Sequence, residues 1–256
     1  MKKIALATAA AIAAGVMLAT PALAGDLKIL TGAGMTAPVR ELAAAFQKQT
    51  GTHVTVVSDT TGGVQKRLEG GETADLVLAT SAVMESLARE RLVAPERTDI
   101  ARVMAGVAVK KGAAEPDVST AEAVKSALLA AKSVAYVDPS VGGIAGPYFA
   151  GLLQKMDIAP QVAAKAVLKK TGGEVAAAVA SDEAELGVTL VSELLPNPGV
   201  TVAGPMPPDI QINTVYAAAL GSGPMNPVAA REFLTRLRGA DGQLAIRQSG
   251  LIAVAQ

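Results

Sequence analysis

Four times along this chain, a short run of β-branched and apolar residues passes through a loop of Gly, Thr or Ser into a helix-like pattern. These junctions fall at residues 30–38, 57–64, 133–149 and 168–175. The alternation of strand and helix predicts mostly parallel sheets flanked by helices. Each junction leaves backbone N–H groups without partners at a helix start, where the helix dipole adds partial positive charge. Because ligands bind beyond the carboxyl ends of such strands, we expect the four loops to face one cleft that holds an anion.

The first 24 residues have the pattern of an export signal. Lys2 and Lys3 precede an uncharged, alanine-rich run over residues 4–18, and Ala22-Leu23-Ala24 supplies the small residues of a cleavage point. The apolar run is shorter than the roughly 20 residues that span a bilayer. Residues 1–24 are therefore predicted to be a cleaved signal peptide, and the rest of the chain is expected in the periplasm.

Composition narrows the classes of function. The formal net charge is zero, aromatic residues make up 2% of the chain and Trp is absent, so nucleic acid is not an expected partner. The chain has no Cys, and its one His, His53, begins a strand directly after a turn. We therefore expect neither a protein metal site nor a Ser-His-Asp triad. No cofactor and no catalytic residue are predicted.

The mature chain is predicted to form two α/β lobes joined by two crossing strands, at residues 103–109 and 212–220. The first lobe comprises residues 25–104 and 210–256, and the second comprises residues 105–209. Two lobes connected in this way enclose a cleft that closes by hinge motion.

Several polar residues at the junctions have two interpretations. Thr60 and Thr61 either bind an oxyanion or cap the helix that follows. Glu174 comes three residues after a Thr, which is the spacing of a capping box and favours a structural role over a catalytic one. Lys169 and Lys170 either attract a polyanion to the cleft or are solvated.

Longer motifs in these loops resemble those of the periplasmic solute-binding proteins of ABC importers, in the group of the molybdate-binding protein. The segments that carry the resemblance are Leu-Thr-Gly-Ala-Gly-Met at 30–35, Arg-Leu-Glu-Gly-Gly-Glu-Thr-Ala-Asp-Leu-Val at 67–77, Val-Asp-Pro at 137–139 with Gly143, and Asp-Glu-Ala-Glu-Leu-Gly-Val at 182–188. The resemblance implies a two-lobed type II binding-protein fold in which backbone amides and hydroxyls hold a small anionic ligand. It also implies delivery of that ligand to a membrane ABC permease, and we expect a monomer.

The resemblance places ligand contacts in all four loops. Gly34 stands where this family has a Ser, so it offers only its backbone N–H, whereas Thr60 or Thr61 keeps the hydroxyl of a second family Ser. A Tyr that molybdate binders place after the strand containing Gly187 is absent, and Thr189 occupies that region. The ligand therefore stays open between a molybdate-like oxyanion and a di- or tricarboxylate. The expected ligand-binding residues are Ala33, Gly34, Met35, Thr60, Thr61, Gly62, Ser140, Gly142, Gly143, Gly173, Glu174 and Thr189.

A second resemblance is to the periplasmic aconitate isomerases, which share this fold. It is carried by Asp-Ile-Ala-Arg at 99–102, Gly-Val-Ala-Val at 106–109, Ser-Glu-Leu-Leu-Pro at 192–196 and Pro-Gly at 198–199. An isomerase needs a base that moves an allylic proton and groups that hold carboxylates. The main prediction is a periplasmic binding protein of an ABC importer, and the alternative is an isomerase of an unsaturated tricarboxylate.

Overall fold

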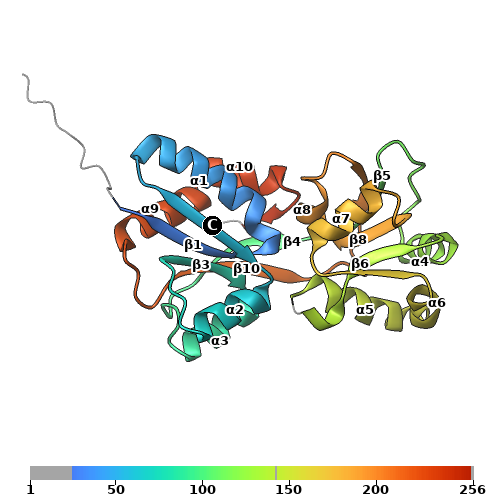
Figure 1. Ribbon diagram of the computed structural model, residues 1–256, viewed down its shortest axis with the longest axis horizontal. Helices are drawn as coiled ribbons and strands as arrows, with labels where there is room; N and C mark the ends of the chain where they lie inside the picture. Colours follow the sequence, from blue (N-terminus) through green and yellow to red (C-terminus); the bar gives the residue numbers. More distant parts are fainter. Residues whose placement is uncertain (1–24, 142, 255–256) are drawn as a thin grey trace, which may run out of the picture.

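The computed structural model describes residues 25–141 and 143–254, and it arranges them in two lobes side by side (Figure 1). Each lobe has a central sheet with helices on both faces. The predicted two-lobed α/β fold is therefore confirmed. The predicted signal peptide at residues 1–24 and the predicted ligand contact at Gly142 lie outside the described residues.

The first lobe is built on a six-stranded sheet in the order β11-β4-β10-β3-β1-β2. β1 pairs in parallel with β2 and β3, whereas β10 runs antiparallel to both β3 and β4. The strands are β1 (Leu27–Gly32), β2 (Val54–Asp59), β3 (Leu76–Thr80), β4 (Thr98–Val103), β10 (Thr214–Leu220) and β11 (Ile252–Ala253).

Helices cover both faces of this sheet (Figure 1). On the first face the rings of Phe46, in α1 (Thr36–Thr50), and Phe233, in α9 (Pro227–Arg238), pack edge to face with their centroids 5.5 Å apart, and this contact fixes the two helices against each other. The first face carries α1, α9 and α10 (Ala240–Gln248), and the short helix η1 (Ala33–Met35) precedes α1. The second face carries α2 (Thr61–Glu69) and α3 (Ser81–Arg89).

The second lobe is built on a five-stranded sheet in the order β7-β6-β8-β5-β9. β6 pairs in parallel with β7 and β8, and β5 runs antiparallel to β8 and β9. The strands are β5 (Ala105–Lys110), β6 (Val134–Val137), β7 (Ala166–Lys169), β8 (Leu186–Leu190) and β9 (Val200–Pro205). The helices are α4 (Ala121–Ala130), η2 (Pro139–Val141), α5 (Ala145–Lys155), α6 (Ala159–Ala163), α7 (Gly172–Ala180) and α8 (Val191–Leu194).

Threonine N-caps explain where several helices begin. The side chains of Thr60, Thr80, Thr120 and Thr171 each accept a hydrogen bond from the backbone N–H three residues later, at the starts of α2, α3, α4 and α7. Such a bond satisfies one of the N–H groups that a helix start leaves without a partner. Two of these caps, at α2 and α7, lie where a strand of each sheet ends, so the caps also shape the loops that face the other lobe.

The chain crosses between the two sheets twice. The first crossing is not the single strand predicted at 103–109, because Met104 separates the end of β4 from the start of β5, and these strands belong to different sheets. In the second crossing, the side chain of Gln211 accepts a hydrogen bond from Ala105 N at 2.7 Å and donates to Met206 O at 2.9 Å. One side chain thus ties both crossings together. No helix in the described part of the chain is long and apolar enough to cross a membrane.

Candidate ligand-binding pocket

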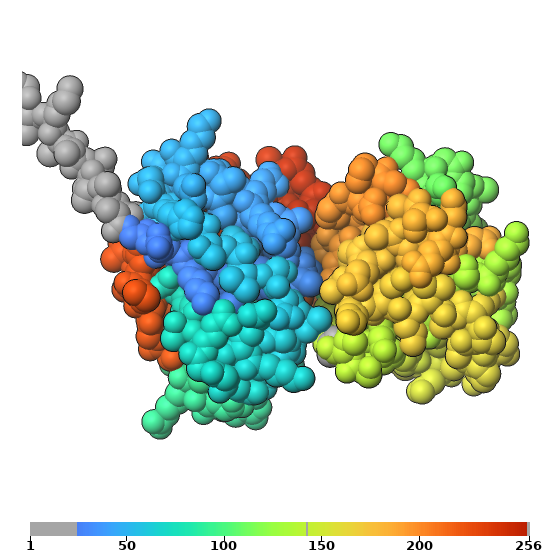
Figure 2. All heavy atoms as spheres, in the orientation of Figure 1, coloured from blue at the N-terminus to red at the C-terminus, as the bar shows by residue number. Residues whose placement is uncertain are grey.

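A pocket lies between the two lobes, where loops that follow strands of both sheets meet. The lobes touch at a narrow waist, which Figure 2 shows from one side. The space within the pocket, counted out to its open mouth, is about 370 Å³. Its lining residues are Ala33, Gly34, Thr60, Thr61 and Tyr216 from the first lobe and Val137, Gly143, Ile144, Ala145, Lys170, Thr171, Gly172, Leu190 and Glu193 from the second.

The structure brings all four predicted junctions to this pocket. Ala33 and Gly34 come from η1, Thr60 and Thr61 from the start of α2, and Gly143 from the loop between β6 and α5. The fourth junction contributes through Lys170, Thr171 and Gly172 at the start of α7. The starts of helices from both lobes therefore border the same space, and their first N–H groups and dipoles favour an anion there.

The other predicted residues that the structure describes are not among the lining residues of the pocket. Met35 is fully buried in the core, and Thr189 is 2% exposed with its hydroxyl directed to Glu193. Glu174 is exposed, and its backbone N–H donates to Thr171 Oγ1 at 3.2 Å, as in the predicted capping box. Its carboxylate accepts a hydrogen bond from Lys170 N at 2.8 Å, one residue before the N-cap, instead of from the N-cap residue itself. Their assignment as ligand contacts stays a prediction, as does that of Gly62, Ser140 and Gly173.

The two lobes approach each other through glycines at the pocket. A Cβ built on Gly34 would lie 3.0 Å from Leu190 Cδ1 in the other lobe and 3.3 Å from the hydroxyl of Tyr216. Gly143 has a φ of +98°, which side chains rarely adopt, and a Cβ there would lie 3.5 Å from Thr60 Cβ across the cleft. Larger side chains at these positions would hold the lobes apart, so the glycines permit a closed pocket.

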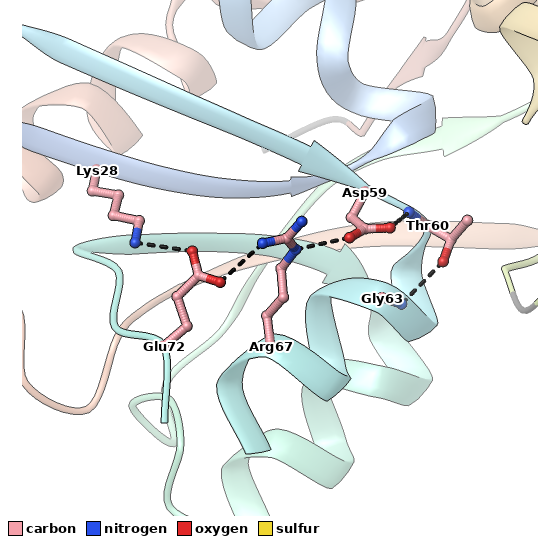
Figure 3. Close-up of polar contacts among 6 residues, drawn as sticks. All are labelled: Lys28, Asp59, Thr60, Gly63, Arg67 and Glu72. Atoms are coloured by element: carbon pink, nitrogen blue, oxygen red, sulfur yellow. Dashed lines mark hydrogen bonds and ion pairs between the residues drawn. The ribbon is translucent and has the colours of Figure 1, made fainter. Parts of the chain in front are cut away.

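An ion-pair network holds the loop that presents Thr60 (Figure 3). Asp59 accepts hydrogen bonds from the backbone N–H of Thr60 at 2.8 Å and from Arg67 Nε at 2.7 Å. Arg67 also contacts Glu72 at 3.1 Å, and Glu72 pairs with Lys28 at 2.9 Å. The hydrogen bonds from Lys28 and then from Arg67 lower the pKa of Glu72. Each exposed pair is individually weak, but the chain of pairs fixes Asp59 against the start of α2.

Tyr216 is a polar lining residue of the pocket on the side of the first lobe. Its side chain is 1% exposed, its hydroxyl lies 3.3 Å from Thr61 Oγ1, and a Cβ on Gly34 would lie 3.3 Å from the same hydroxyl. Burial raises the pKa of Tyr216 to about 12, and the negative charge of Glu193 adds to this effect. Tyr216 is therefore a neutral hydroxyl that contacts two pocket loops.

Glu193 lines the pocket from the second lobe, on the opposite side from Tyr216. Burial raises the pKa of Glu193, although hydrogen bonds from the Thr189 hydroxyl, at 2.8 Å, and from the backbone of Leu190 act in the opposite direction. No salt bridge found among the described residues includes Glu193. The carboxyl group packs against Gly172, where a Cβ would lie only 2.5 Å from Glu193 Cδ. A carboxyl group with these surroundings gains a proton more readily than an exposed one.

Sequence reasoning missed Glu193 and Tyr216 as pocket residues. Glu193 follows the carboxyl end of β8 by three residues, and that position is the signal by which it could have been found. Tyr216 lies inside an antiparallel strand that returns from the other lobe, so no local pattern marks it. The described residues contain no group of three His, Asp or Glu side chains that could hold a metal ion.

The chain forms two α/β lobes, passes between them twice, and leaves a pocket where they meet. This arrangement defines a two-lobed ligand-binding protein of the type II fold. A family model described as "Bacterial extracellular solute-binding protein" matches residues 27–252. The chain belongs to this family of bacterial extracellular solute-binding proteins.

Comparisons with individual proteins agree with both resemblances stated from the sequence. An aconitate isomerase from Pseudomonas sp. is 34% identical over 252 residues, which cover 94% of each chain. The periplasmic molybdate-binding protein of Azotobacter vinelandii has a TM-score of 0.73 and 21% identity over 90% of this chain and 100% of its own. The substrate-binding domain of a molybdenum ABC transporter from Clostridium difficile has a TM-score of 0.70 and 20% identity, covering 91% and 100%. The two structures share the fold.

Proposed function

We propose that this protein captures a small organic anion with two or three carboxylates in the pocket between its lobes. The observation that carries the proposal is the mixed character of the pocket wall. Helix starts and Lys170 supply groups that attract negative charge, whereas Ala33, Val137, Ile144 and Leu190 present apolar surface. Apolar side chains suit the carbon skeleton of an organic acid, and an inorganic oxyanion has no such part.

The relative that resembles this chain along most of its length supports the same ligand class, because it is named for its action on aconitate. The pocket also lacks the hydroxyl that molybdate binders place after the first strand, since Gly34 occupies that position. These two observations favour a carboxylate over molybdate.

Transport is the role that the family favours. We propose that residues 1–24 direct export, that the mature protein is a periplasmic monomer, and that it passes its ligand to a membrane ABC permease. The family description as an extracellular solute-binding protein supports this proposal. Closure of the lobes around the ligand would present one closed surface to the permease.

The test is thermal unfolding in the presence of candidate ligands. A ligand that binds only the folded state at a concentration of 100 times its Kd stabilises by about 2.7 kcal/mol. For a chain of this size, this corresponds to a rise in Tm of about 5–10 °C. We expect this rise with citrate, tricarballylate or trans-aconitate, and a smaller one or none with molybdate, tungstate and sulfate. A response to molybdate alone would refute the proposed ligand class.

Isomerisation of an unsaturated tricarboxylate is a second candidate, and Glu193 is the observation that favours it. A carboxyl group of raised pKa in the pocket is suited to remove a proton from the CH2 carbon of aconitate and to return it to the former vinylic carbon. Deuterium exchange into trans-aconitate, followed by proton NMR in deuterated buffer, tests this function. Steady exchange with the protein present shows an isomerase, and its absence leaves the binding function alone.

A further inference from the structure

Glu193 occupies an unusual position for a carboxylate, because the pocket around it is otherwise built to attract negative charge. Its carboxyl group packs on Gly172, the first residue of α7, and accepts a hydrogen bond from Thr189 at 2.8 Å. It lines the same space as the starts of α2 and α7. An anion bound in the pocket therefore meets Glu193.

Few titratable groups surround this carboxyl. α8 packs on β5, β8, β9, α7 and η1. Of these elements, β8, β9 and η1 contain no titratable side chain, β5 contributes Lys110, which pairs with Asp182, and α7 contributes Glu174, which is exposed. The titratable side chains that line the pocket itself are Glu193, Tyr216 and Lys170. Lys170 is thus the one cation of the described lining, and it is exposed to solvent.

We propose that the pocket binds its carboxylate ligand together with one proton, which Glu193 shares with a carboxylate of the ligand. This inference rests on the proposed binding function and adds to it a residue that determines specificity. The physical reason is that an ionised Glu193 and a ligand carboxylate would repel each other, although the helix starts and the exposed Lys170 attract the ligand. A protonated Glu193 instead donates a hydrogen bond to the ligand.

The sharing of a proton makes affinity depend on pH. Binding raises the pKa of Glu193 further, so the complex takes up a proton at any pH between the pKa values of the free and the occupied pocket. In that interval linkage requires the Kd to rise about tenfold for each pH unit. The ligand carboxylates are ionised above about pH 7, so their own titration does not produce this slope above that pH.

The experiment is calorimetric titration of the full mature chain with tricarballylate, a saturated tricarboxylate that has no allylic proton to move. Kd is measured between about pH 7 and pH 9, and the binding enthalpy at one pH is compared in phosphate and Tris buffers to count protons. We expect a tenfold rise of Kd per pH unit over part of this range and uptake of about one proton. Glu193→Gln keeps a hydrogen-bond donor without the charge, so its Kd should not vary with pH.

Glu185→Gln is the matched control, because Glu185 is an exposed carboxylate at the opposite end of β8, where it accepts a hydrogen bond from Lys132 N. This variant should keep the slope of the wild-type protein. A wild-type Kd that is constant with pH, with no proton uptake, overturns this inference and leaves the binding function standing. A slope that persists in Glu193→Gln also overturns it. If the wild-type protein binds none of tricarballylate, citrate and trans-aconitate, the inference and the proposed ligand class fail together.

Discussion

Gly172→Ala tests the packing around the pocket carboxyl most directly. Gly172 is the buried first residue of α7, and a Cβ there would lie 2.5 Å from Glu193 Cδ and 2.6 Å from Thr189 Oγ1. Real Cβ atoms essentially never approach other atoms within 3.0 Å. The side chain of Glu193 must therefore turn away, and the hydrogen bond that it accepts from Thr189 must break or lengthen.

The expected loss in the free energy of unfolding follows from these displacements. A lost hydrogen bond costs about 0.5–1.5 kcal/mol, and an off-rotamer side chain costs a similar amount. Replacing a helical Gly by Ala returns up to about 1 kcal/mol. We expect Gly172→Ala to lower the free energy of unfolding by roughly 1–2 kcal/mol and the Tm by about 2–8 °C. Because Glu193 lines the pocket, its displacement should also lower the stabilisation by tricarboxylates.

The neighbouring residue supplies the control. Gly173 lies in the same helical turn, but a Cβ there would have Thr171 Oγ1 as its nearest neighbour, at 4.0 Å. Gly173→Ala should therefore leave the Tm unchanged or raise it. Urea unfolding and thermal unfolding of both variants measure the difference. Equal stabilities for the two variants would show that the carboxyl of Glu193 does not occupy the space next to Gly172, and the reasoning would be wrong.

Four further substitutions extend the test. Thr60→Ala and Thr120→Ala each remove an N-cap, and each should lower the free energy of unfolding in urea by about 1 kcal/mol. Only Thr60→Ala should weaken ligand binding, and equal losses of binding in both variants would contradict the assignment of the pocket as the ligand site. Tyr216→Phe removes the hydroxyl that lies 3.3 Å from Thr61 Oγ1 and should cost about 0.5–1.5 kcal/mol, so an unchanged Tm counts against that hydrogen bond. Because burial raises the pKa of Glu193, the folded state loses stability as pH rises from the unfolded pKa through the folded one. Glu193→Gln should therefore be more stable than wild type at about pH 8, by a margin that shrinks toward about pH 4, and a constant margin would argue against the raised pKa.

Local sequence patterns were sufficient for most of the fold. A strand passes through a loop into a helix at each of the four predicted junctions, from β1 to α1, β2 to α2, β6 to α5 and β7 to α7, because apolar periodicity and Thr or Gly at the helix starts are local properties. β9 was not predicted, since Val200–Pro205 ends in a proline-rich segment. This strand lies at the edge of its sheet, next to β5, where proline removes fewer ladder hydrogen bonds. Its pairing depends on β5, which the sequence pattern alone did not divide from β4.

The pocket likewise combines features that local sequence predicts with contacts between distant segments. Local patterns along the chain were enough to predict that four helix starts offer N–H groups to an anion, because each strand, glycine loop and helix is contiguous in the sequence. The other groups that the ligand meets are brought together by folding. Thr61 and Tyr216 are 155 residues apart in the sequence and their hydroxyls lie 3.3 Å apart in the fold. Glu193 becomes a pocket carboxyl of raised pKa because two lobes close around it, and burial of this kind is a property of packing between distant segments.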